Sequence, residues 1–193
     1  QRLILAFNAV PINPTNQLVQ VEESNRGVDF GFRDAIHITG DLCFTSLLRY
    51  QALLQLAELY QMRGNSLEYH RMKLSARNLK QQIVRVFQDS RGMLKASTGK
   101  SAQADVWATS LAIHLGVLSG QTRLNASQYL RNAYLKGELS QKGNIRHVIQ
   151  SDDFSTTTAW EKSVVPINTY QNGAYWGTPV GWVCQAIAYT DLQ

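Results

Sequence analysis

Between residues 42 and 63, apolar side chains recur at steps of three and four, which places them on one face of an α-helix. Gly64, which tolerates a positive φ, ends this stretch. Asn65 and Glu68 then form a cap pair for a second stretch that runs to residue 87. The pattern therefore predicts a helical hairpin. Its apolar positions are Leu42, Leu47, Leu48, Leu54, Ala57 and Tyr60, then Tyr69, Met72, Ala76, Leu79, Ile83, Val86 and Phe87.

A second pair of helical stretches repeats this plan. Residues 102–115 and 123–136 each carry an apolar face, and a glycine follows each of them. Near the end of the chain, Thr178 is a favourable N-cap and Pro179 suits the first position of a further helix. We therefore expect two complete helical hairpins and the first half of a third.

The remaining segments lack a helical period. Prolines and asparagines interrupt residues 1–30, so we expect an irregular N-terminal segment there. Residues 137–177 are polar and contain glycines, with one short candidate strand at 145–149. A loop of about 40 residues in a compact domain is usually functional. The expected organisation is a single partial domain over 1–193. Helical hairpins occupy 31–193, and the loop at about 137–177 that is expected to carry the site lies between two of their helices.

Helical hairpins that bury one face on their neighbours form bundles, solenoids or toroids. All of these are all-α architectures, and the periodicity alone does not choose between them. The chain opens on an apolar run and stops within an apolar helical stretch, so we expect further residues beyond both ends.

Composition narrows the class of protein. Hydrophobic residues make up 44% of the chain and charged residues 17%, a balance typical of globular proteins. No apolar run is long enough to cross a membrane, so we expect no membrane partner. The net charge of +5 comes from basic residues scattered along helical stretches, which favours a solvated helix face over nucleic-acid binding. Cys43 and Cys184 lie on apolar stretches typical of buried free thiols, with a disulfide as the alternative.

Aromatic and amide side chains interleave near the end of the long loop. A pyranose ring offers an apolar C–H face on which aromatic rings stack, and hydroxyls that amide and guanidinium groups bind. This mixture of side chains favours carbohydrate binding, and aromatic residues that simply cover the core are the alternative. The candidates for stacking and hydroxyl binding are Trp107, Arg146, His147, Tyr170, Gln171, Asn172, Tyr175 and Trp176.

Hydrolysis of a glycosidic bond generally needs two carboxylates, one to protonate the leaving oxygen and one to activate water or attack the sugar. Asp34 lies just before the first helix, and Asp105 lies near the start of another, two residues before Trp107. Either aspartate has an alternative role as a negative charge that favours a helix N-terminus. Glu161 is the reserve candidate. We see no metal-ligand spacing or phosphate-binding loop and expect neither metal nor cofactor.

Several segments together carry a resemblance. They are Gly31-Phe32-Arg33-Asp34-Ala35-Ile36 with Thr39-Gly40, Ser46-Leu47-Leu48-Arg49-Tyr50-Gln51-Ala52, Asp105-Val106-Trp107-Ala108-Thr109, Gly143-Asn144-Ile145-Arg146-His147-Val148, Tyr170-Gln171-Asn172-Gly173-Ala174-Tyr175-Trp176 and Gly181-Trp182. Over about residues 28–191, the chain resembles the six-hairpin glycosidase superfamily of (α/α)6-barrel glycoside hydrolases. The Tyr-Gln-Asn-Gly segment is the most specific of these, since similar segments line the sugar site in several such hydrolases.

The resemblance implies a toroid of twelve helices that binds sugar at one mouth and hydrolyses it by acid/base catalysis, often with inversion and without a metal. This chain supplies about five of those helices. The resemblance therefore implies that the rest of the domain, or a second chain, completes the ring. Sugar handling also tilts the expected localisation towards a secreted or periplasmic protein.

The leading hypothesis is a glycoside hydrolase built from helical hairpins of a partial (α/α)6 toroid. Asp34 and Asp105 would be the site carboxylates. Two alternatives keep a sugar site. One is a non-catalytic glycan-binding protein on the same fold, and the other is a lyase or epimerase with Tyr170 or Tyr175 as proton carrier. A helical-repeat interaction scaffold is the alternative without one.

Overall fold

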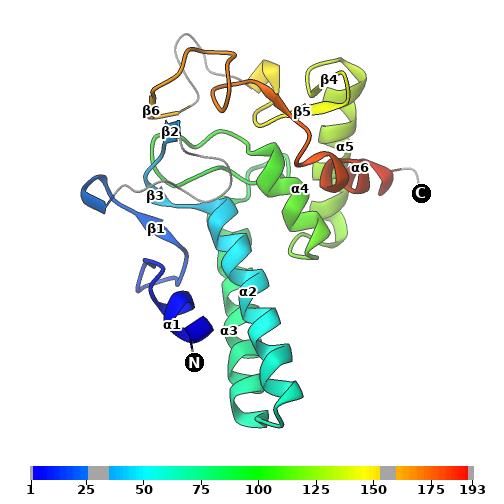
Figure 1. Cartoon of the computed structure of the whole chain (residues 1–193). Helices are drawn as coiled ribbons and strands as arrows, with labels where there is room; N and C mark the ends of the chain where they lie inside the picture. Colours follow the sequence, from blue (N-terminus) through cyan, green and yellow to red (C-terminus); the bar gives the residue numbers. More distant parts are fainter. Residues whose placement is uncertain (1, 26–34, 153–159, 191–193) are drawn as a thin grey trace.

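The computed structural model describes residues 2–25, 35–152 and 160–190 (Figure 1). Helix accounts for 51% and strand for 15% of the structure, with three small antiparallel sheets. The fold is therefore mixed α/β. The expectation of an all-α fold, made only of helical hairpins from an (α/α)6 toroid, is wrong.

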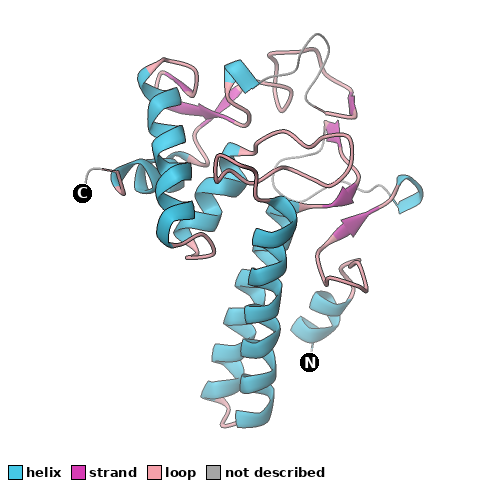
Figure 2. Ribbon diagram, turned by 180° about the vertical axis from the view of Figure 1, so that it is seen from behind, coloured by secondary structure: helices cyan, strands magenta, loops and turns pink. Residues whose placement is uncertain are grey.

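The first predicted hairpin is present and forms the longest part of the molecule. Helix α2 (Cys43–Met62) and helix α3 (Ser66–Phe87) run side by side and project from the rest of the fold (Figures 1 and 2). Gly64 turns the chain between them with a φ of +70°. Asn65 caps α3, because its side-chain oxygen accepts a hydrogen bond from the Glu68 backbone N–H at 3.1 Å.

The second half of the fold is built around helix α4 (Val106–His114), which is buried along almost its whole length. Helix α5 (Gly120–Leu135) and helix α6 (Val180–Ala188) pack against it. The predicted helix at 102–115 starts later than expected because Asp105 caps it, and Pro179, not Thr178, occupies the cap position of α6.

Both cysteines are free thiols. The predicted burial is confirmed for Cys43 and wrong for Cys184, which is exposed.

The three small sheets lie in segments where the sequence shows no helical period. Strand β1 (Gln20–Val21) pairs with β3 (Gly40–Asp41), and β2 (Ile36–His37) pairs with β6 (Lys162–Ser163). The third sheet has the order β4 (Ser140–Gln141), β5 (Asn144–Arg146), β7 (Tyr175–Trp176). Strands of two or three residues are too short to produce an alternating pattern, which is why the sequence predicts only one of them.

The N-terminal segment is more ordered than its sequence suggests. It contains helix α1 (Arg2–Asn8), strand β1 and a 3-10 turn (Glu23–Asn25), although an irregular segment was expected. Asn13 and Asn16 both donate side-chain hydrogen bonds to the buried carboxylate of Asp41, at 3.1 Å and 2.7 Å. These bonds satisfy a charge that would be costly to bury alone, and they fix the segment to β3.

A turn in the middle of the long loop is also held in place by a charged pair. The Arg91 guanidinium donates to Asp152 in a second 3-10 turn (Gln150–Asp152) at 2.7 Å, and the Tyr129 hydroxyl donates to the same carboxylate at 2.9 Å. Burial, and secondly the hydrogen bond to Asp152, raise the pKa of Tyr129. The turn is therefore tied both to α5 and to the segment after α3.

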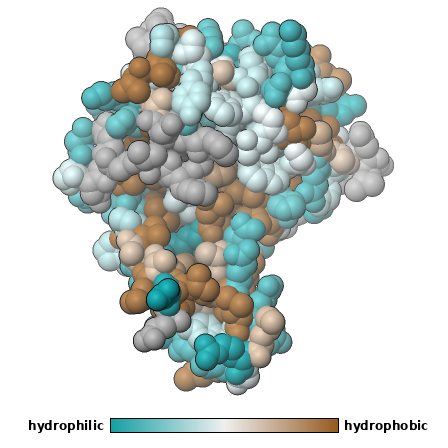
Figure 3. Space-filling model, viewed as in Figure 1, coloured by the Kyte–Doolittle hydropathy of each residue, from teal (hydrophilic) through white to brown (hydrophobic). Residues whose placement is uncertain are grey.

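One face of the molecule exposes apolar side chains over α1 and α2. The exposed fraction is 62% for Leu3 and 83% for Met62. Two adjoining cavities of about 520 and 470 Å³ share Leu3, Leu56 and Leu59 in their linings. Figure 3 shows apolar residues gathered over the lower part of this face. Among the described helices, none combines the length and the hydropathy needed to span a membrane.

Two leucines on α3 give a matched test of the hairpin. Leu79 is buried and Leu74 is 59% exposed, five residues earlier on the same helix. Leu79→Ala should lower the free energy of unfolding by about 2–5 kcal/mol, because it leaves a cavity in the core. Leu74→Ala should change it by less than about 0.5 kcal/mol. Urea titration followed by circular dichroism measures both, and equal losses would contradict the packing described for α3.

Candidate functional site

Asp105 caps α4 from a completely buried position. Its Oδ1 accepts a hydrogen bond from the Ala108 backbone N–H at 2.9 Å and lies 3.3 Å from Nε2 of His147. Asp is favoured at this position because its oxygen satisfies an amide that the helix leaves unpaired. Asp105 therefore joins the start of α4 to the residue that follows β5. In this arrangement its carboxylate does not contact solvent, and it acts on its surroundings through His147.

His147 lies at the centre of a chain of aromatic rings. Its imidazole stacks on the indole of Trp107, with ring centroids 4.2 Å apart and 11° between the planes. Trp160 approaches His147 from another side at 5.2 Å, and Trp176 meets Trp107 edge-on at 6.3 Å. Trp107, His147 and Trp160 are buried, whereas Trp176 is only half-buried. The inner rings thus form a rigid support, and the outer ring reaches the surface.

Arg146 is buried and contacts residues near the end of the long loop. Its Nη2 donates to the Asn168 side-chain oxygen at 3.0 Å, and its guanidinium lies 5.9 Å from the centre of the Tyr175 ring. A Cβ at Gly173 would approach Arg146 Nη2 to 2.9 Å, and Gly173 has a φ of +101°. A side chain at position 173 would therefore strain the backbone and push against the buried guanidinium.

The amides of Gln171 and Asn172 are buried, and both hold protein backbone. Gln171 Oε1 accepts a hydrogen bond from the Ala35 N–H at 2.7 Å, and Asn172 Nδ2 donates to the Val165 carbonyl at 3.0 Å. Gln171 Nε2 has no hydrogen-bond partner among the described residues. A buried amide nitrogen of this kind normally finds an acceptor, and the described residues supply none for its two N–H groups.

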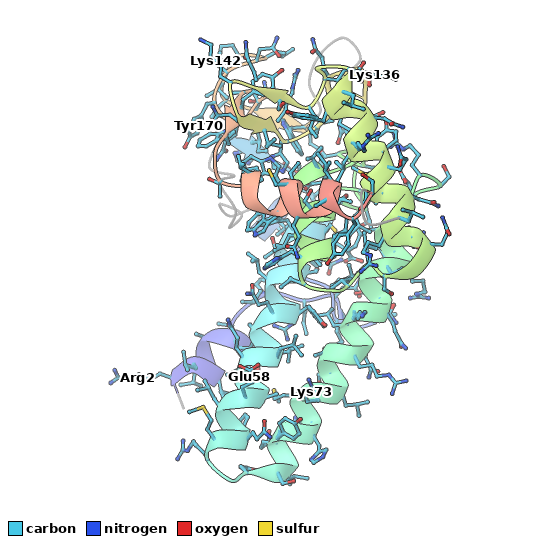
Figure 4. All side chains as sticks on the ribbon, turned by 90° about the vertical axis from the view of Figure 1, so that its right-hand side faces the viewer. Arg2, Glu58, Lys73, Lys136, Lys142 and Tyr170 are labelled. Carbon is cyan, nitrogen blue, oxygen red and sulfur yellow. The ribbon has the colours of Figure 1, made fainter. Side chains whose placement is uncertain are left out.

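Tyr170 and Trp176 form the exposed end of the aromatic chain. Tyr170 is 44% exposed, and its ring lies 5.1 Å from that of Trp176 in an edge-on arrangement. The Trp176 indole N–H donates to the Tyr170 carbonyl at 3.2 Å, which fixes both residues relative to each other. Tyr170 lies at the far end of the molecule from the tip of the α2–α3 hairpin (Figure 4).

Glu161 is fixed at the edge of a separate small cavity. Its Oε1 accepts hydrogen bonds from the backbone N–H groups of Thr39 and Lys100, both at 3.1 Å, and its Oε2 accepts from the Thr39 hydroxyl at 2.8 Å. A Cβ at Gly99 would come within 2.6 Å of Oε1, so only glycine allows this close approach. The cavity encloses about 340 Å³, and Glu23 and Lys162 complete its lining.

The structure brings most of the predicted site residues into one contiguous network around β5, β7 and the start of α4. Glu161 joins it through the preceding Trp160, whose ring contacts His147. Asp34 lies outside the described residues. The residues gathered in the network are Asp105, Trp107, Arg146, His147, Tyr170, Tyr175 and Trp176. Asn172 joins it through Asn168, whose backbone N–H donates to the Asn172 carbonyl, whereas Gln171 is held by the Ala35 backbone.

Sequence reasoning does not predict the contacts that hold Glu161 and Arg146, although Thr39 lies in one of the segments that carry the resemblance. Thr39 and Lys100 reach Glu161 from positions 122 and 61 residues away, a separation that leaves no local signal. The side-chain oxygen of Asn168 accepts a hydrogen bond from Arg146, and Asn168 has a positive φ of 63°. The sequence reveals neither feature. Trp160 is the exception, because its place directly before a candidate carboxylate gives it some prominence.

Comparison with known proteins adds no relative: no protein-family model matches the chain, and no curated protein matches it. In the part of the chain that the structure describes, no group of three or more His, Cys, Asp or Glu residues is placed to hold a metal ion. The groups that the described site presents are partly exposed aromatic rings and the fixed Glu161 carboxylate.

Two substitutions at position 105 separate the capping contact from the charge. Asp105→Ala removes both the cap and the partner of His147, and it should lower the free energy of unfolding by about 2–3 kcal/mol. Asp105→Asn keeps a capping oxygen and should cost less than about 1 kcal/mol. Thermal and urea unfolding measure both variants. Equal destabilisation by the two would show that the charge, not the cap, carries the contribution.

Proposed function

We propose that the chain carries the sugar site of a glycoside hydrolase, with Glu161 as one of its acid/base carboxylates. The observation that carries the proposal is that one segment, residues 160–177, presents both the fixed Glu161 carboxylate and the exposed rings of Tyr170 and Trp176. A glycosidase needs this combination, because it must hold a sugar face while a carboxylate acts on the glycosidic oxygen or on water.

The rigidity of the carboxylate supports an acid/base role. Thr39 and Lys100 hold both oxygens of Glu161, so little conformational freedom remains to be lost when a substrate binds. The cavity beside it is open and contains a second carboxylate, Glu23, and two lysines. Such polar groups suit sugar hydroxyls, which donate to carboxylates and accept from ammonium groups.

The aromatic network supports sugar binding by a different route. Tyr170, Tyr175 and Trp176 are at least partly exposed, while the rings behind them are buried. Their apolar faces suit the C–H face of a pyranose, and their positions are fixed by Arg146 and by the stacked pair of His147 and Trp107. In this proposal Asp105 positions His147, and Asp34 remains the sequence candidate for the second carboxylate.

Asp105 also favours a second candidate function, a glycan-binding protein without turnover. Asp105 is completely buried against the cap of α4 and His147, whereas Glu161 lines a cavity, so one of the predicted pair is not available to a substrate in this arrangement. The two functions differ in one observable: both predict glycan binding, and only the hydrolase releases product.

Glu161→Gln tests the hydrolase directly. The amide keeps the shape of the side chain but cannot exchange a proton, so the rate on an aryl glycoside that the chain cleaves should fall at least about 100-fold. Glu58→Gln on α2 is the control, because Glu58 is exposed and lies far from the long loop (Figure 4). Retention of full activity by Glu161→Gln would refute the assignment. Glycan binding by a wild-type chain that cleaves no aryl glycoside would favour the second candidate.

Tyr170→Ala tests the stacking surface. Loss of the exposed ring should weaken oligosaccharide binding about fivefold, since an aromatic contact contributes on the order of 1 kcal/mol. Tyr134→Ala is the matched control, because Tyr134 is 51% exposed on α5. Isothermal titration calorimetry measures both dissociation constants. Equal affinities for the two variants would place the sugar elsewhere.

A further inference from the structure

A second polar cavity lies on another part of the molecule, between the second half of α3 and the turn that leads from α4 into α5. It encloses about 510 Å³. Its apolar floor includes Val117 and Leu118, which are buried. Gln81 and Val84 also line it, none of the described acidic residues does, and three cationic side chains and two hydroxyls complete the lining. They are Arg77, Lys80, Arg85, Ser119 and Thr122.

The three cations converge because of their spacing on α3. Positions 77, 80 or 81, and 84 or 85 recur once per helical turn, so they share one face of the helix. Leu79 and Ile83 are buried in the core on a different face. The exposed Lys73 and Arg71 earlier on α3 do not line the cavity. Part of the basic helix surface expected from the sequence therefore lines a hollow.

Internal hydrogen bonds hold two of these cations, but no carboxylate neutralises them. Lys80 Nζ donates to the Gly116 carbonyl at 2.6 Å, and the Arg85 guanidinium donates to the Gln82 side chain at 2.6 and 3.0 Å. Neither these two residues nor Arg77 forms an ion pair with any described residue. Like charges around an apolar-floored hollow concentrate positive potential within it.

We propose that this cavity binds a tetrahedral oxyanion, phosphate or sulfate, either free or carried on a sugar. Guanidinium groups match two oxygens of such an anion, and the ammonium of Lys80 adds a point charge. The Ser119 hydroxyl makes no capping bond to α5, so it is available as a further donor. An extended nucleic acid fits less well, because no aromatic residue lines the hollow for bases to stack on.

This site is independent of the proposed glycosidase function, since none of its lining residues belongs to the network around His147 or to the cavity beside Glu161. Isothermal titration calorimetry and amide NMR of the full chain, at low ionic strength, test it with inorganic phosphate, sulfate and chloride. Glucose 6-phosphate and glucose form a second pair of probes, which separates a free anion from one carried on a sugar.

The decisive variants remove the same charge from two places on α3. The pair Lys80→Gln and Arg85→Gln should weaken phosphate binding at least about tenfold, because two charge-assisted contacts are lost. The control pair Arg71→Gln and Lys73→Gln removes the same net charge and should change affinity less than about twofold.

In the wild-type chain, phosphate and sulfate, but not chloride, should shift the amide signals of Gly116, Ser119 and Thr122. Tighter binding of glucose 6-phosphate than of phosphate identifies a sugar-borne anion, and equal binding identifies a free one. Absence of these shifts overturns the proposal. So does an equal loss of affinity in the two double variants, because it would reflect net charge and not the cavity.

Discussion

At one fully buried point, the Asp105 carboxylate contacts both the first turn of α4 and His147. Helix α4 is the element around which α5 and α6 pack, so the cap fixes where the core of this half begins. His147 in turn stacks on Trp107 and touches Trp160. Because a buried polar group needs its hydrogen-bond partners, this contact couples the helix start to the aromatic network.

The segment from Trp160 to Gly177 depends on this support. Its inner residues are held by the protein interior: Trp160 by His147, and Gln171 by the Ala35 amide. Its outer residues, Tyr170 and Trp176, contact each other and leave part of their rings exposed. A segment with little regular structure thus has fixed side chains because buried polar groups must find partners. In contrast, the cations around the proposed anion-binding cavity on α3 remain without a counter-charge among the described residues.

The sequence predicts helices α2 to α6 well but misses α1 and most strands, because the helical signals are local in sequence and most strand pairings are not. The α2–α3 hairpin follows from apolar spacing, Gly64 and the Asn65 cap, all of which are local. Apart from the local β4–β5 hairpin, the strands pair residues far apart in sequence, such as Ile36 with Ser163, and each strand is too short to show alternation. The same holds for the site. Residue types in the Tyr-Gln-Asn-Gly segment are readable, whereas the contact of Thr39 with Glu161 depends on tertiary structure.

The central claim is that the outer end of the aromatic network binds sugar, and the indole N–H signals of the tryptophans test it most directly. The chain has four tryptophans. Trp176 lies at the proposed site, and Trp182 packs on Phe44 elsewhere. Titration of the ¹⁵N-labelled chain with oligosaccharides should shift the Trp176 indole signal in a saturable way and leave that of Trp182 unchanged. A saturable shift of the Trp182 signal without one of Trp176, or no shift of either signal with any oligosaccharide, would contradict the account.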